Sequence, residues 1–117
     1  MKGEDIAYRL RRYAADVVRL SRKFPPDFAS KHIARQLLRS GTGGGSNYEE
    51  ARGSESRADF VHKLGIANKE LRESLYWLEL AQDADVIGDV GSIAREASEL
   101  IAILTRSIRT AKGDSRE

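Results

Sequence analysis

Basic side chains recur at helical spacing in the first third of the sequence, where they could contact phosphate groups. A stripe on a helix predicted over residues 5–24 carries Asp16 among its cations, which are Arg9, Arg12, Arg19 and Lys23. A second stripe repeats every four residues and consists of Lys31, Arg35 and Arg39. Such stripes are typical of salt-dependent, weakly sequence-specific nucleic-acid binding. They are also what the solvated faces of two amphipathic helices look like. Neither stripe has an aromatic residue among its members, so base stacking is not predicted.

Catalytic and metal-binding chemistry finds little support in the residue types. Asp59 and His62 have the i, i+3 spacing of helix-borne metal ligands, but His32 is the only other histidine and the paired motif of a di-metal bundle is absent. A third hypothesis is a carboxylate-dependent metal enzyme that uses Glu49, Glu50 and Asp59. Solvated carboxylates near helix ends would explain the same residues without a metal. We therefore expect a non-enzymatic protein with no cofactor and no metal.

A glycine-rich segment, residues 39–56, reads RSGTGGGSNYEEARGSES. It lacks the preceding strand that a dinucleotide-binding loop needs, and no Gly-Lys-Ser/Thr follows. If the helix continues through it, Leu37, Gly41, Gly44 and Tyr48 lie on one side, where glycines would let another backbone approach closely. Because each helical glycine costs about 1 kcal/mol relative to alanine, we expect a kink or local disorder over residues 41–46. The turn is predicted at residues 52–54.

Length and composition favour one small helical domain. The chain has 117 residues, 40% hydrophobic and 32% charged, with no cysteine and a formal charge of +2. Residues 1–47 carry ten Lys/Arg against four Asp/Glu, whereas residues 48–85 carry an excess of four acidic groups. This asymmetry favours an anionic partner or head-to-tail self-association. The N-terminus lacks the apolar core of a signal peptide and no apolar run could span a membrane, so we expect a cytoplasmic protein without a membrane partner.

Hydrophobic periodicity predicts four helices and no strand. The first covers residues 5–24 and ends before Pro25. Asp27 caps the second, whose apolar face is predicted to contain Phe28, Ile33, Leu37 and Leu38. Ser56 and Asp59 have capping-box spacing before a third helix that runs to about Asp83. Gly88 and Asp89 signal the turn before the fourth, whose seam runs from Val90 to Ala111. The pattern predicts an all-α, up-down-up-down antiparallel four-helix bundle over residues 1–111, with a frayed tail over 112–117.

A near-continuous series of residues resembles a known family. It runs through Gly45-Ser46-Asn47-Tyr48-Glu49-Glu50-Ala51-Arg52, then Asp59-Phe60, Lys63-Leu64 and Tyr76-Trp77-Leu78-Glu79-Leu80. Together these resemble the four helix bundle protein family, also called the 23S rRNA-intervening-sequence proteins, to which the retroelement accessory variability determinant protein is related. The signature residues, which are the expected structural or interface positions, are Gly45, Asn47, Tyr48, Glu50, Ala51, Asp59, Lys63, Tyr76 and Trp77.

The resemblance implies properties that the spacing does not. It implies a bacterial up-down bundle that assembles as a homopentamer, has no enzymatic activity and keeps the second helix continuous through the signature. It also implies RNA or DNA as a partner and, from the retroelement member, a reverse transcriptase. Combined with the charge pattern, it gives the hypothesis of an oligomeric bundle that contacts nucleic-acid phosphates through helices one and two. The alternative is a protein-assembly module that does not bind nucleic acid.

Overall fold

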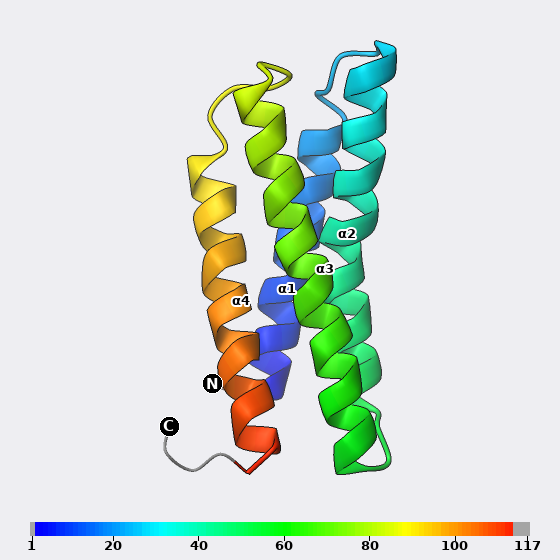
Figure 1. Ribbon diagram of the computed structural model, residues 1–117, viewed down its shortest axis with the longest axis vertical. Coiled ribbons are helices and arrows are strands. Elements are labelled where there is room, and N and C mark those ends of the chain that lie inside the picture. Colours follow the sequence, from blue (N-terminus) through cyan, green and yellow to red (C-terminus); the bar gives the residue numbers. More distant parts are fainter. Residues whose placement is uncertain (1, 114–117) are drawn as a thin grey trace.

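The described part of the chain folds into four helices, as the hydrophobic periodicity predicts. The computed structural model describes residues 2–113, and no strand occurs in that range. The helices are α1 (Gly3–Ser21), α2 (Phe28–Arg52), α3 (Arg57–Asp83) and α4 (Gly91–Ala111). They run alternately up and down along a body 46 Å long and 25 by 20 Å across (Figure 1). The up-down-up-down antiparallel bundle is therefore confirmed, and no described helix is long and apolar enough to cross a membrane.

Side-chain caps fix where the two long central helices begin. The Asp27 carboxylate accepts a hydrogen bond from the Ser30 backbone N–H, 3.0 Å away, at the start of α2. At the start of α3, the Ser56 hydroxyl accepts one from the Asp59 backbone N–H at 3.1 Å. Each cap satisfies one of the donors that a helix leaves unpaired at its first turn. Both predicted caps are confirmed, and α2 ends at Arg52 with Gly53 as its C-cap, at the predicted turn.

The core is a single cluster to which all four helices contribute leucines or small aliphatic residues. Leu10 and Val17 of α1, Leu37 of α2, Leu71 of α3 and Leu100 of α4 are each fully buried. These positions recur at steps of three, four and seven along their helices, so each helix presents one apolar stripe to its neighbours. Burial of those stripes is the main stabilising contribution to a fold of this size.

The glycine-rich segment is helical throughout and not disordered, because its glycines lie where α2 is wedged between α1 and α3. A Cβ on Gly41 would lie 2.7 Å from Val17 Cγ1, and one on Gly44 would lie 2.9 Å from Leu71 Cδ2. Only a residue without a side chain permits helices this close. Packing of the buried stripe that includes Leu37 and Tyr48 offsets the poor helix propensity of the glycines. The expected local disorder over residues 41–46 is therefore wrong, and the close-approach interpretation is confirmed.

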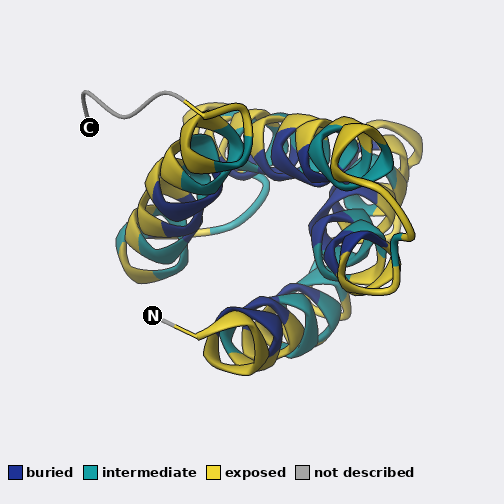
Figure 2. Cartoon of the chain, turned by 90° about the horizontal axis from the view of Figure 1, so that it is seen from below, coloured by how far each residue is buried: buried dark blue, intermediate teal, exposed yellow. Residues whose placement is uncertain are grey.

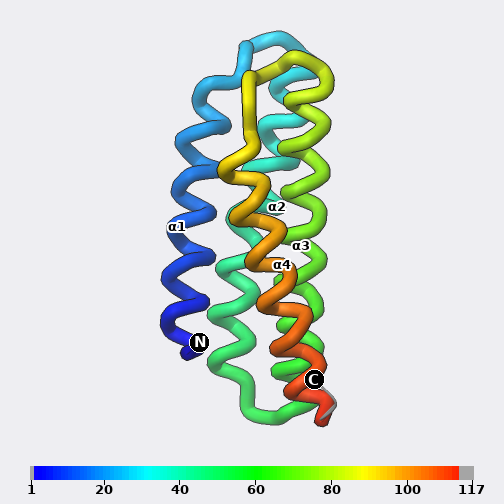
Figure 3. The backbone as a smooth tube through the Cα atoms, turned by 90° about the vertical axis from the view of Figure 1, so that its left-hand side faces the viewer, coloured from blue at the N-terminus to red at the C-terminus, as the bar shows by residue number. Residues whose placement is uncertain are grey.

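The helices follow an arc that is open between its first and last members. Viewed along the bundle, α1 and α4 form the two ends of the arc, and the buried residues line its inner side (Figure 2). From the open side, α1 and α4 run next to each other in front of α2 and α3 (Figure 3). The pair α1–α4 also has far fewer contacts than the successive pairs. A surface hollow lies along this open seam.

The predicted apolar face of α2 differs from the structure at two positions. Phe28 is 91% exposed and Leu38 is 38% exposed, so neither belongs to the buried face of α2. Nine helical steps of 100° place Phe28 opposite Leu37, and the core side is completed by the small residues Gly41 and Gly44 instead. The expected frayed tail, residues 112–117, lies outside the described residues from position 114 onward.

Candidate nucleic-acid interface

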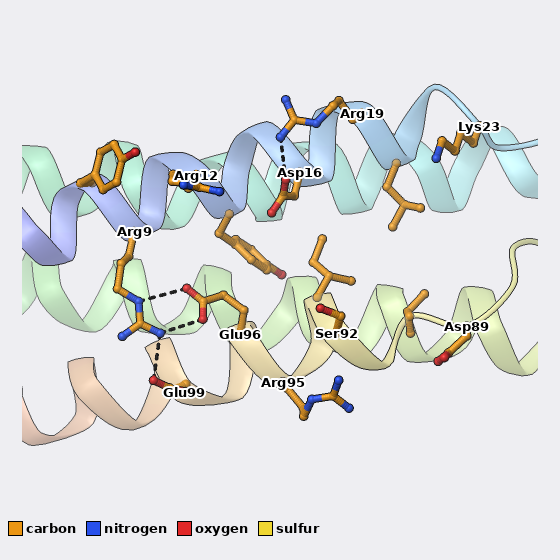
Figure 4. Close-up of a pocket in the computed structure, with 15 residues that line it drawn as sticks. Arg9, Arg12, Asp16, Arg19, Lys23, Asp89, Ser92, Arg95, Glu96 and Glu99 are labelled. Atoms are coloured by element: carbon orange, nitrogen blue, oxygen red, sulfur yellow. Dashed lines mark hydrogen bonds and ion pairs between the residues drawn. The ribbon is translucent and has the colours of Figure 1, made fainter.

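The hollow between the first and last helices, the α1–α4 groove, brings four of the predicted phosphate-binding residues together. Its walls come from residues 8–23, which include most of α1, and residues 89–99, which include the first half of α4. Its volume is about 810 Å³. Figure 4 shows the labelled side chains along α1, along the first half of α4 and on the segments next to these helices; Arg9 and Glu96 meet between the two helices, whereas Arg95 lies on the side of α4 away from α1. The predicted members that line it are Arg9, Arg12, Arg19 and Lys23.

Arg9 closes the groove at one end by binding two carboxylates of the opposite wall. Its guanidinium donates to both carboxylate oxygens of Glu96, at 2.7 and 3.1 Å, and to Glu99 at 2.9 Å (Figure 4). The fork geometry of arginine suits this paired arrangement. The hydrogen bond to Glu96 raises the pKa of Arg9 above its ordinary value. The charge of Arg9 is thus already compensated within the chain, and its clear role is to tie α1 to α4.

The other predicted cations of α1 divide into one paired and two unpaired groups. Arg19 forms an ion pair with Asp16 at 2.6 Å on the same helix. Arg12 has no carboxylate partner among the described residues, and its guanidinium carbon lies 5.9 Å from the centre of the Tyr8 ring. Lys23, at the far end of the groove, is exposed and also lacks an ion-pair partner in the described part of the chain. Arg12 and Lys23 therefore retain uncompensated charge beside the groove.

The opposite wall adds a cation that the sequence reasoning missed. Arg95 of α4 lines the groove and forms no ion pair within residues 2–113. The charges in residues 86–117 cancel, so composition gave no signal for Arg95. Tyr8, which is half exposed at the same groove, was also missed. Only the packing of α4 beside α1 places these two side chains with Arg12 and Lys23.

The cations predicted on α2 lie away from this groove. Arg39 binds Glu70 of α3 at 3.1 Å and also forms an ion pair with Glu73, so it joins α2 to α3. Lys31 and Arg35 are exposed, and no ion pair with either occurs among the described residues. The structure therefore separates the two predicted basic stripes. The α1 stripe faces the groove with α4, whereas Arg39 contacts the opposite neighbour, α3.

An aromatic group lies on the outer surface formed by α2 and α3. Trp77 packs edge-to-face against His32 of α2, with 5.8 Å between ring centres, and against Tyr76 at 5.1 Å. Its indole N–H donates to Glu73 at 3.0 Å. Tyr76 is 57% exposed. The signature residues Tyr76 and Trp77 therefore belong to a surface, with Trp77 only partly buried against the core.

The remaining signature residues of α2 are mainly structural. Gly45 lies against α1, where a Cβ would come 3.4 Å from Leu10 Cβ. Asn47 donates to the Gly43 carbonyl oxygen at 2.9 Å. Tyr48 and Ala51 are buried in the core, and burial raises the pKa of Tyr48. Glu50 is exposed.

The residues considered for metal binding are used differently. Asp59 forms an ion pair with Lys63 one turn later, at 3.1 Å, and His62 is exposed. Glu49 pairs with Arg52 at 3.2 Å. Among residues 2–113, no group of three or more His, Asp or Glu side chains is arranged to hold a metal ion. The two signature residues Asp59 and Lys63 thus stabilise the start of α3.

Comparisons with known proteins agree with this fold. The family model of the 23S rRNA-intervening sequence protein matches residues 5–106. A crystal structure of a protein with unknown function from the S23 ribosomal protein family of Bacteroides thetaiotaomicron superimposes with a TM-score of 0.85. The two chains are 34% identical, and the match covers 93% of this chain and 99% of that one. A comparison with curated proteins finds no match. From the extent of the family match, the chain belongs to the 23S rRNA-intervening sequence protein family.

Proposed function

We propose that this chain is a non-enzymatic, homo-oligomeric bundle that binds nucleic acid by holding phosphates at the α1–α4 groove. The observation that carries the proposal is that Arg12, Lys23 and Arg95 all line one groove and form no ion pair among the described residues. Four carboxylates share the groove with them: Asp16 binds Arg19, Glu96 and Glu99 share Arg9, and Asp89 forms no ion pair within residues 2–113. The five cations that line the groove exceed these carboxylates by one. A phosphate chain would therefore meet net positive charge there.

Three cations give a modest interaction from one chain. Each neutralised phosphate contributes through the release of counterions, so affinity falls steeply with salt. Assembly of several chains, pentameric by the family resemblance, would present the groove repeatedly to one polymer and raise the apparent affinity. RNA or DNA satisfies this chemistry equally, and a reverse transcriptase remains a partner proposed by resemblance alone.

A charge-matched set of variants tests the proposal. The triple variant Arg12→Gln, Lys23→Gln, Arg95→Gln removes the groove cations, and a control triple, Arg57→Gln, Arg72→Gln, Arg106→Gln, removes three exposed cations elsewhere. Both sets change the net charge equally. Fluorescence anisotropy across a salt series should show weaker binding and a salt slope smaller by about 2 for the groove triple with a single strand. Equal losses in both triples would overturn the assignment of the groove.

A further variant tests whether the cations of α2 contribute to nucleic-acid binding. Lys31→Gln with Arg35→Gln removes the two α2 cations that lie outside the groove and without ion-pair partners in residues 2–113. We expect this double variant to bind nucleic acid with less than half the free-energy loss of the groove triple. A larger loss would move the proposed contact from the α1–α4 groove to α2.

A specific observation favours protein assembly as a second candidate function. Phe28 is 91% exposed on α2, and Tyr76 is 57% exposed beside Trp77 on α3. Exposed aromatic side chains of this kind are enriched at protein interfaces. Light scattering on Phe28→Ser and Arg35→Glu variants tests it. A fall in mass with unchanged nucleic-acid binding would support assembly, whereas unchanged mass would contradict it.

A further inference from the structure

A half-exposed tyrosine at the α1–α4 groove offers a planar apolar surface beside the unpaired cations. Tyr8 is 50% exposed and lines the groove. The guanidinium carbons of Arg11 and Arg12 lie 5.5 and 5.9 Å from the centre of its ring. Aromatic rings and guanidinium planes are the two surfaces on which unpaired nucleobases stack in proteins. Arg11 and Arg12 follow Tyr8 by three and four residues, so one helical turn brings both arginines next to its ring.

The cations are spread over both walls in a way that suits a chain of phosphates. Arg12 lies one helical turn from Tyr8 on α1, Lys23 lies two residues after the end of α1, and Arg95 comes from α4. At a rise of about 1.5 Å per residue, α1 covers roughly 14 Å from Arg12 to its end at Ser21, and Lys23 follows two residues later. The groove therefore presents positive charge along its length rather than at one point. An extended polyanion matches this arrangement better than a single small anion.

From the ring and the cations together, we infer that the α1–α4 groove binds single-stranded nucleic acid, with a base stacked on Tyr8 and Arg12 and phosphates contacting Lys23 and Arg95. This inference rests on the proposed function and specifies that the nucleic acid is single-stranded. At about 810 Å³ the groove has the size of a site for a short run of unpaired nucleotides. Because every base has a flat face, stacking of this kind tolerates many sequences.

Tyr8 is the feature that distinguishes a single strand from a duplex. In a duplex the base faces are covered by their stacked neighbours, so Tyr8 could touch only the sugar-phosphate surface. In a single strand a base is free to leave its neighbours and cover the ring. Removal of the ring should therefore weaken single-strand binding and leave any duplex binding nearly unchanged. Removal of a cation should weaken both.

Fluorescence anisotropy with matched oligonucleotides tests this inference. The probes are a labelled single strand of about 12 nucleotides, of mixed sequence, and the duplex of the same sequence. Loss of the ring in Tyr8→Ala should weaken single-strand binding by about fivefold to a hundredfold. Tyr8→Phe should retain binding within about twofold, since it keeps the stacking surface. Leu38→Ala is the control, because Leu38 is also an exposed apolar side chain but lies on α2, outside the groove.

The outcomes separate this inference from the proposed function. Salt-dependent binding of both probes with no effect of Tyr8→Ala would overturn the single-strand inference and leave phosphate binding standing. Binding of neither probe at low salt would overturn the proposed function itself. Displacement of the single strand by poly-glutamate at equal charge concentration would make the groove a site for acidic protein segments, which also overturns the inference. A circular dichroism spectrum and melting curve should be unchanged in Tyr8→Ala, because the side chain is half exposed.

Discussion

The hydroxyl groups of Tyr13 on α1 and Ser74 on α3 lie 2.7 Å apart in the core. Both side chains are buried, and the two helices are not successive neighbours in the bundle. The Ser74 hydroxyl also lies 2.7 Å from the Leu71 carbonyl oxygen, which can only accept. The Ser74 hydroxyl therefore donates a hydrogen bond to the Leu71 carbonyl oxygen and accepts one from the Tyr13 hydroxyl. This buried hydrogen bond fixes α1 against α3 beneath the open seam.

Tyr13→Phe should change how stability responds to alkaline pH. Burial raises the pKa of Tyr13 to about 12 from 10.0 in the unfolded chain. Because the folded pKa is the higher one, the unfolded chain loses its proton first as pH rises, and stability falls between pH 10 and 12. The difference of about two pKa units is worth about 2–3 kcal/mol. Near pH 8 the variant should be about 1 kcal/mol less stable than the parent, from the lost hydrogen bond. Urea unfolding at several pH values should show that gap closing above pH 10, and parallel curves would contradict the prediction.

Two glycine substitutions should change stability in opposite directions. Gly41→Ala places a methyl group 2.7 Å from Val17, whose branched side chain cannot turn away, and should cost about 1–3 kcal/mol. Gly65→Ala meets nothing within 4 Å on an exposed part of α3, and should stabilise the helix by about 0.5–1 kcal/mol. Urea unfolding measures both. Stabilisation by Gly41→Ala would mean that α1 and α2 are not in close contact there.

The helices and their caps were predictable because the signals are local. The cap at Asp27 and the apolar repeat from Leu64 to Leu78 depend on residues within a few turns of each other. The continuity of α2 was harder, since propensity penalises Gly41 and Gly44 and only contacts with Val17 and Leu71 on other helices reverse that penalty. Helix propensity alone predicts that residues 41–46 are not regular helix, whereas packing against the neighbouring helices keeps them helical.

Only one wall of the α1–α4 groove could be predicted from the sequence, because the other wall depends on tertiary packing. The stripe containing Arg12 and Lys23 follows from the period of one helix. Its pairing with α4, which brings in Arg95 and places Glu96 against Arg9, depends on how the bundle is arranged in space. The periodic pattern predicts that α4 has a polar face, but it does not predict which helix lies beside that face.

The carboxylate cap of α2 should make part of the stability acid-sensitive. Hydrogen bonding to Ser30 lowers the pKa of Asp27 below its ordinary 3.8. A lowered folded pKa means that the contribution is complete above 3.8 and is lost as pH falls towards the folded pKa. Asp27→Asn keeps a capping oxygen but cannot be protonated in this range, so its stability should fall less between pH 5 and pH 2 than that of the parent. Thermal melts over this range provide the comparison, and identical acid losses would exclude Asp27 as a contributor.

The cap of α3 gives a simpler prediction. Ser56→Ala removes the hydroxyl that accepts from the Asp59 backbone N–H and should cost about 1 kcal/mol. Ser54→Ala is the neighbouring control, because Ser54 lies in the same turn but does not cap α3. Chemical unfolding of the two variants should therefore differ, and equal values would show that the cap contributes no measurable stability.

The pair Arg9–Glu96 should carry more coupling energy than the surface pair Arg19–Asp16. Arg9 and Glu96 are one-quarter and one-third exposed and join two helices that otherwise have few contacts, whereas Arg19 and Asp16 are 62% and 49% exposed on one helix. A double-mutant cycle with Arg9→Met and Glu96→Gln should give a coupling of about 1 kcal/mol that decreases at high salt. The same cycle at Arg19 and Asp16 should give less than half of that value. If the two cycles give equal couplings, Arg9 is a surface charge like Arg19, and the seam between α1 and α4 is held by its apolar contacts alone.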